Sequence, residues 1–447
     1  EMCIRDRCSD RCEDVAVGGR RLGGTGLQVS GVVRCQPSVG SFVAGTTTAS
    51  GEQQCGPGVE IDEGDGTNTN CNSGGMVAAR QLNRATLARQ SLLERADATV
   101  PDMLRRIVAV QAQDPASPYV ALCNRIAEFD PADLDAAFGE HTVVKASLMR
   151  ITLHAVHADD YTPFHTAMTP ALRASRLNDP RFSDTGWTIA DADAVLPHLA
   201  AMLVERRTRP EIEAALADHL DAEPHARVWW ALRTFAPIFH APTDAIWSFG
   251  REPAYVRAPD DDRPSEIEAT AQLIRRYLAG FGPASASDVN QFSILPRSIL
   301  HPAFESLEGE LVGFAGPDGT TLLDIDGGEL PDPDVPAPPR LMAMWDSTLL
   351  AYADRSRIIP EEYRRLVIRR NGDVLPTLLV DGYVAGVWRL TDDGIEVRPF
   401  HPLPDDTWDE LAGEAAGLEA MFAERSRTYG RFGNWWDGLP DAGSRML

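Results

Sequence analysis

The segment Leu104–Arg125, with the sequence LRRIVAVQAQDPASPYVALCNR, is the part of the chain from which the rest can be interpreted. It begins with apolar residues at i, i+3 and i+4, which predict one face of an amphipathic helix. Gln111 follows at i+7, where this pattern favours an apolar side chain. Pro115 disfavours helical dihedrals at the residue before it. The segment therefore predicts a helix over 101–113 that ends near Gln113.

The two glutamines have two interpretations. Residues two apart point to nearly opposite sides of an intact helix, so Gln111 and Gln113 could face one pocket only where the helix unwinds. Burying two amides costs a few kcal/mol unless each finds hydrogen-bond partners. The alternative is a capped helix end whose glutamines donate to loop carbonyls. The sequence leaves both open.

The composition describes a large and acidic chain. It has 447 residues, 43% of them hydrophobic, and a net charge of −24. This length supports two to four domains with their own cores. No apolar run approaches the roughly 18 residues of a membrane span, so we expect a soluble, cytoplasmic protein with no membrane partner. A negative field repels nucleic acid, so any DNA-binding surface requires locally concentrated arginine.

Residues 1–75 differ from the rest of the chain. Six of the seven cysteines lie there, among Gly, Ser, Thr and Asn without a helical period. A secreted disulfide module would explain the even number, but no signal-peptide-like apolar region precedes it. We therefore expect a non-native or disordered leader over 1–75, with Met76 as the start. The remaining Cys123 is expected to be a core residue.

A pattern of helices followed by a hairpin occurs three times, and such internal repeats indicate the architecture. The first copy has expected helices over 85–96, 101–113, 118–128 and 131–138 and a hairpin over 142–157. The second has helices over 191–205, 209–219 and 227–239 and a hairpin over 245–256. The third has helices over 266–281, 287–292 and 302–307, then strands over 311–314 and 320–325 around a Pro-Asp-Gly turn. Helices followed by a short hairpin are typical of winged-helix units.

The C-terminal part has a different character. A proline-rich, stiff linker is expected over 331–339. Strand-like segments over 340–350, 375–380, 384–390 and 395–400 indicate a small β-barrel, followed by a helix over 407–426. The predicted fold is α+β, mainly α. Its expected parts are three tandem winged-helix units (76–180, 181–262, 263–330), the linker, the β-barrel (340–402) and a C-terminal helix and tail (403–447).

Winged helices commonly place their third helix in the major groove of DNA. The third copy argues against this use, because its last predicted helix contains Glu305 and no Arg or Lys. Arginine pairs, including those at 206–207 and 369–370, are each typical of a solvated surface, but converging pairs could grip a phosphate backbone. The residues expected to contact DNA are Arg105, Arg106, Lys145, Arg150, Arg275, Arg276, Arg364 and Arg365.

From about Leu82 to Phe400 the chain resembles the AlkZ/YcaQ-type DNA glycosylases. The matching pieces are NR 83–84 with LARQ 87–90, VQAQDP 110–115 with PY 118–119, LMR 148–150 with TLH 152–154, WD 345–346 with ADR 353–355, and NGDVLP 371–376 with VDG 380–382. The resemblance implies a tandem winged-helix fold with a C-terminal β-barrel. It also implies a catalytic Gln-x-Gln or Gln-x-Asp motif that excises alkylated bases and unhooks N7-guanine crosslinks. This chain has the Gln-x-Gln form, at Gln111 and Gln113.

The residues themselves are compatible with that chemistry. Glutamine is no general base, but two amides can position one water by donating and accepting hydrogen bonds. An N7-alkylpurine is cationic and already a good leaving group, so a positioned and weakly activated water can trap the sugar at C1′. The chain lacks the carboxylate of Gln-x-Asp members at position 113. Asp114 could supply one, although Asp before Pro is equally typical of a turn.

Other candidate residues are weaker. The resemblance places His154 near the active pocket, and Tyr119 belongs to the same matching motifs. His154 and His157 have the spacing of a metal pair, but no third ligand is evident and a strand would separate them, so we expect no metal. No phosphate-binding Gly-rich loop or nucleotide-cofactor motif occurs, so we expect no cofactor.

Lys145 is the only lysine, and a glycosylase that also cleaves the strand attacks C1′ with an amine. Apolar neighbours could lower the pKa of Lys145, but a lysine that reaches solvent or a phosphate is favoured. We therefore predict a monomeric, nucleoid-associated, monofunctional DNA glycosylase. Its expected partner is double-stranded DNA with bulky alkylated or crosslinked purines. The alternatives are a non-catalytic DNA-binding regulator or damage-recognition scaffold, and an interaction scaffold without DNA.

Overall fold

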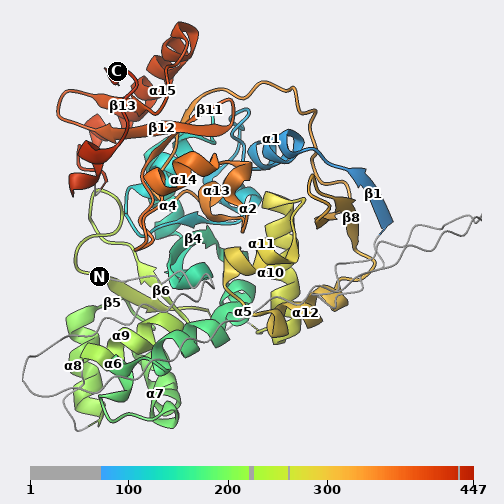
Figure 1. Cartoon of the computed structure of the whole chain (residues 1–447). Coiled ribbons are helices and arrows are strands. Elements are labelled where there is room, and N and C mark those ends of the chain that lie inside the picture. Colours follow the sequence, from blue (N-terminus) through green and yellow to red (C-terminus); the bar gives the residue numbers. More distant parts are fainter. Residues whose placement is uncertain (1–71, 221–225, 260–261, 431–432) are drawn as a thin grey trace, which may run out of the picture.

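The computed structural model describes residues 72–220, 226–259, 262–430 and 433–447 (Figure 1). Residues 1–71 of the expected leader lie outside these ranges. The last four residues of the leader, 72–75, are described and belong to β1 (Asn72–Met76), which pairs in parallel with β8 (Leu311–Ala315). The expected boundary at residue 75 therefore cuts through a strand.

The described chain folds into a mixed arrangement of α-helices and three sheets. Its first part contains α1 (Ala79–Arg89), α2 (Val100–Ile107), β2 (Val110–Gln111), α3 (Ser117–Cys123), α4 (Pro131–Gly139), β3 (Val143–Ser147), β4 (Leu153–His157) and α5 (Ala158–Leu177). Its middle part contains α6 (Pro180–Ser183), α7 (Ile189–Met202), β5 (Arg207–Thr208), α8 (Arg209–Leu220), α9 (Ala226–Phe235), β6 (Ile238–Ala241) and β7 (Ala254–Arg257).

The third part contains α10 (Glu266–Phe281), α11 (Ala286–Ser293), α12 (Arg297–Ser306), β8 and β9 (Thr321–Ile325). The C-terminal part contains β10 (Arg340–Leu341), α13 (Ser347–Leu350), α14 (Glu361–Val367), β11 (Thr377–Val380), β12 (Tyr383–Leu390), β13 (Ile395–Pro399), α15 (Asp405–Glu424) and β14 (Arg445–Met446). None of the helices in the described ranges is long and apolar enough to cross a lipid bilayer.

The helix expected over 101–113 ends six residues early, at Ile107. Val108 has a φ of 75°, an uncommon conformation for a β-branched residue, and this breaks the helix before Gln111. The side chain of Val108 packs against the backbone of α10 at Gly280. A Cβ atom at position 280 would lie only 2.6 Å from the Val108 side chain. Only glycine permits this approach, so tertiary packing sets the end of α2.

Other boundaries also shift for identifiable reasons. Helix α1 begins at Ala79 rather than at residue 85, because the buried polar residues Asn83 and Arg84 have partners elsewhere in the fold. Helix α12 begins at Arg297, so the last helix of the third copy is not free of basic residues. The 20-residue helix α5 was not predicted, because it contains Pro163 and Pro170, which normally interrupt helices.

One antiparallel sheet joins the first two helix-and-hairpin copies. Its strand order is β2-β4-β3-β6-β7-β5, and the pair of Lys145 with His240 connects β3 to β6. The second hairpin therefore consists of β6 and β7 rather than residues 245–256, and the helix expected to reach residue 239 ends at Phe235. The sheet places β2, which carries Gln111, at its edge. In Figure 1, β4 lies between the N-terminal helices and α10.

The C-terminal strands form an open sheet of order β10-β11-β12-β13-β14, in place of the expected closed barrel. The strand expected over 340–350 is wrong, because only Arg340–Leu341 pairs and α13 follows, capped by Asp346. The tight turn at Asp381-Gly382 docks on α1, where Asn83 Nδ2 donates to Gly382 O (2.9 Å). A Cβ at Gly382 would lie 2.5 Å from Leu87, so this turn requires glycine.

A buried ion pair fixes α3 against the start of the C-terminal part. The Arg125 guanidinium donates twice to the carboxylate of Asp346, at 2.9 Å each, and both side chains are 1% exposed. Asp346 also accepts from the N–H and hydroxyl of Thr348. A charge buried this deeply is tolerated only while its partner is present.

We predict that Asp346→Ala lowers the free energy of unfolding by about 3–5 kcal/mol, because it leaves Arg125 buried without its counterion. The matched control is Asp159→Ala, which removes the exposed partner of Arg105 and should cost about 1 kcal/mol or less. Chemical denaturation of both variants measures the difference. Equal losses of unfolding free energy in the two variants would show that the buried ion pair stabilises the fold no more than the exposed one.

Candidate active site

Gln111 lies on β2 directly opposite His154 on β4, and His154 pairs in turn with Ala146 on β3. Residues opposite each other in a sheet project to the same face. The pairing continues one residue further, because the Ala112 N–H donates to Leu153 O at 2.8 Å. In extended backbone, residues two apart lie on one side, so this geometry favours a common side for Gln111 and Gln113.

Among the described parts of the chain, the amide oxygen of Gln111 is available to a ligand. Gln111 is 5% exposed, and its buried amide oxygen accepts no hydrogen bond from a described residue. A buried acceptor without a partner costs about 1–3 kcal/mol, and such groups are expected where a ligand or water supplies the donor.

His154 is fully buried and neutral. Its Nε2 lies 3.2 Å from a guanidinium nitrogen of Arg150, which can only donate, so Nε2 accepts. The proton therefore resides on Nδ1, which donates to Thr152 O at 3.1 Å. Burial lowers the pKa of His154 to about 3, and the charge of Arg150 lowers it further. With its lone pair engaged, His154 is a weak base at neutral pH.

Arg150 and Arg355 bring positive charge to this face of the sheet. Arg150 donates to Phe292 O at 3.0 Å, and its guanidinium lies 5.4 Å from the Phe292 ring. Burial lowers the pKa of Arg150 to about 10, and the nearby charge of Arg355 contributes. In the sequence, only the place of Arg355 in the ADR motif at 353–355 indicates this position.

Asp114 and Tyr119 have structural contacts. Asp114 Oδ1 accepts from the Ala116 N–H at 2.9 Å, which is the turn role that its place before proline favoured. The Tyr119 hydroxyl donates to Asp135 at 2.5 Å and contacts Ser248 at 2.8 Å. Burial, followed by the hydrogen bond to Asp135, raises the pKa of Tyr119. Both residues lie close in sequence to the glutamines, but these contacts hold the surrounding loops.

Lys145 does not extend to solvent, which corrects the favoured expectation for it. It is 4% exposed, and its Nζ lies 4.2 Å from the centre of the Phe249 ring. Burial lowers the pKa of Lys145 to about 7, against the opposing effect of Asp114. It lies beside Ala146 in β3, so it projects to the face opposite His154. His157 likewise projects away from His154 and accepts from the Asp159 N–H.

The other arginines expected to contact DNA fall into two classes. Four of them face carboxylates: Arg105 with Asp159, Arg106 with Glu329, Arg275 with Glu310 and Arg276 with Asp160. Their charges are partly neutralised, which weakens them as contacts for phosphate. Arg364 and Arg365 on α14 form no ion pair with any described residue.

The buried histidine predicts a specific acid sensitivity. The pKa of His154 is about 3 in the folded chain against 6.5 when exposed, so its contribution to stability is complete above pH 6.5 and is lost as the pH falls toward 3. Between these two pKa values, one such histidine increases the free energy of unfolding by about 1.4 kcal/mol for each unit of rising pH. We expect His154→Gln to reduce the slope of unfolding free energy between pH 4 and pH 6 by that amount. An unchanged slope would mean that His154 is protonated in the folded protein.

Comparison with known proteins identifies the family of the chain. The family model described as "DNA glycosylase AlkZ-like" matches residues 104–421. The interstrand DNA cross-link repair glycosylase of Streptomyces sahachiroi is 26% identical over 368 residues, which are 78% of this chain and 96% of the relative. The solved structure of Streptomyces sahachiroi DNA glycosylase AlkZ superposes with a TM-score of 0.67 at 22% identity, covering 80% of this chain and 99% of that one. The family match spans most of the chain and contains both glutamines, so the protein belongs to the AlkZ-like DNA glycosylases.

Proposed function

We propose that this protein is a monofunctional DNA glycosylase that hydrolyses the N-glycosidic bond of bulky or crosslinked N-alkylpurines. The proposed water-positioning residues are Gln111 and Gln113. The observation that carries the proposal is the buried amide oxygen of Gln111, which has no partner among the described residues and lies beside His154. The curated relative, an interstrand cross-link repair glycosylase, supports a crosslinked substrate.

The proposed reaction breaks the bond between C1′ and the purine nitrogen. The bonding electron pair leaves with the cationic alkylpurine, which becomes neutral, and the sugar passes through an oxocarbenium-like state. Water then bonds to C1′ and releases a proton to solvent. The two glutamine amides hold this water by one accepted and one donated hydrogen bond, so their contribution is proximity and orientation.

At neutral pH the neutral His154 and the glutamine amides can neither take up a proton nor deliver one to the leaving base, and this restricts the substrate. His154 has a lowered pKa and an engaged lone pair, and the amides cannot take up a proton. A site with these groups suits only a base that leaves without assistance. An N7- or N3-alkylpurine carries its own positive charge and meets this requirement, whereas an unmodified purine does not.

The proposed partner is duplex DNA, bound by a monomer in the cytoplasm near the nucleoid. The recurrence of helices followed by hairpins supports tandem winged-helix units as the DNA-binding scaffold. A non-catalytic DNA-binding protein is the alternative, and the assay of excision separates the two.

We predict that Gln111→Ala or Gln113→Ala reduces single-turnover excision by about 100-fold or more, because positioning contributes several kcal/mol. Affinity for DNA and melting temperature should stay close to wild type. The assay is abasic-site formation on a duplex with one N7-alkylguanine. Gln272→Ala, at an exposed glutamine on α10, is the control. Wild-type rates in both site variants would remove the glutamines from the mechanism, and DNA binding without excision by the wild type would favour the alternative.

A second prediction concerns strand cleavage. A lyase would need the Lys145 amine to attack C1′ and form a Schiff base that borohydride traps. Lys145 is buried against Phe249 on the face opposite His154, so we expect neither a trapped adduct nor strand scission with damaged duplex. An adduct that forms in the wild type and disappears in Lys145→Met would replace hydrolysis by amine catalysis.

A further inference from the structure

A group of four arginines surrounds the end of α14. Arg364 and Arg365 lie in its last turn, and Arg369 and Arg370 lie in the tight turn that follows. The Ile368–Val374 bridge and the bond from the Arg369 N–H to Asp373 O (2.9 Å) close this turn. A hollow of about 560 Å³ is lined by Arg365, Ile368, Arg369, Arg370 and Asn371.

These four arginines lack the ion pairs with carboxylates that most other arginines of the described residues form. No described carboxylate forms an ion pair with any of the four, although the chain has a net charge of −24. The nearby carboxylate of Asp373 instead accepts from Asn371 Nδ2 at 2.8 Å. Arginines at a helix C-terminus are favoured by the helix dipole, which explains the two on α14 but not the two on the turn. The group is therefore a local positive surface on an acidic protein.

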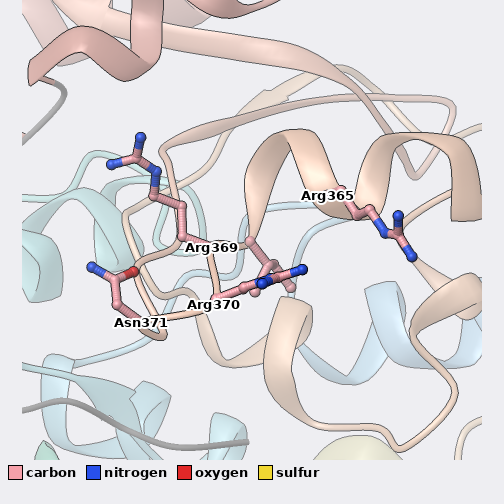
Figure 2. Close-up of a pocket in the computed structure, with 5 residues that line it drawn as sticks. Arg365, Arg369, Arg370 and Asn371 are labelled. Carbon is pink, nitrogen blue, oxygen red and sulfur yellow. The ribbon is translucent and has the colours of Figure 1, made fainter. Parts of the chain in front are cut away.

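The side chains are arranged in two directions. Figure 2 shows the guanidinium of Arg370 extending toward the helix that carries Arg365, whereas Arg369 points to the other side of the turn. Arg369 is held there by the Trp435 ring, 4.3 Å from its guanidinium. Arg365 and Arg370 are both exposed. Asn371 also points to the side of Arg369 in Figure 2. The guanidiniums of Arg365 and Arg370 can each donate to the oxygens of one phosphate or of two adjacent phosphates.

Hydrogen bonds connect this turn to the candidate active site. The Trp345 indole N–H donates to Gly372 O in the turn at 2.8 Å. Two residues later, the Ser347 hydroxyl donates to Ala109 O at 2.9 Å. Ala109 is two residues before Gln111, so the arginine turn is fixed to the strand that carries the catalytic glutamine. A single DNA duplex could therefore contact both.

We propose that Arg365 and Arg370 form a phosphodiester-binding site for the backbone of the DNA on which the enzyme acts. The identity of the ligand as DNA rests on the proposed function. The contact is independent of sequence, because guanidiniums that reach phosphate oxygens carry no information about the bases. The site thus anchors the duplex while the glutamines position the water that attacks C1′.

The test is binding of undamaged duplex DNA by the full chain, measured by fluorescence anisotropy over a range of salt concentrations. Each phosphate contact contributes roughly 0.9 to the slope of log affinity against log salt. We expect Arg365→Gln/Arg370→Gln to make the slope shallower by about 1.8 and to weaken binding roughly tenfold at moderate salt. The control is Arg181→Gln/Arg209→Gln, which removes the same charge at exposed arginines already paired with Asp179 and Glu213, and should leave the slope unchanged.

The outcomes separate this site from the proposed reaction, because binding to undamaged DNA involves no excision. A reduced slope in a protein that excises nothing would retain the phosphate site and reject the glycosylase mechanism. An unchanged slope, an equal effect of the control, or no DNA binding by the wild type would overturn the site. Inorganic phosphate, added at constant ionic strength, should not compete at millimolar concentration. Selective competition with the wild type and not with the arginine variant would indicate a site for free phosphate instead.

Discussion

The end of α2 at Ile107 is the constraint on which the candidate site depends. Val108, with its positive φ and its close packing against Gly280, converts the backbone from a helical to an extended path. The side-chain period changes from 3.6 to 2 at that point, so residues two apart no longer point to opposite sides. Without this break, Gln111 would lie on the apolar face of a helix and could not pair with His154.

Contacts between distant segments hold this break in place. Gln90 on the end of α1 donates to Gly280 O at 2.9 Å, and Ser347 donates to Ala109 O. The buried pair of Arg125 and Asp346 joins residues 221 positions apart in the sequence. The site is therefore built on one edge of a sheet and supported by both α10 and the C-terminal part, which limits the freedom of the glutamine strand.

The parts of the fold that could be predicted are those whose signals are local. Helices α4 and α10 follow clear patterns and begin directly after Asp130 and Ser265, whose side chains cap them. The early end of α2 and the α5 helix could not be predicted, because one depends on packing against Gly280 and the other overrides two prolines. The glutamine pair was identified by its motif and its place on an apolar face. Its position opposite His154 results from strand register between distant segments, which the sequence does not specify.

The central claim is that the described site contains positioning groups and no group that protonates the leaving base, so the substrate must carry a base that departs without assistance. The most direct measurement compares single-turnover excision of a cationic N7-alkylguanine and an uncharged O6-alkylguanine in otherwise identical duplexes. This account predicts excision of the N7-alkylguanine and no detectable excision of the O6-alkylguanine. Comparable rates for the two bases would show that the protein activates the leaving group, and would contradict the account.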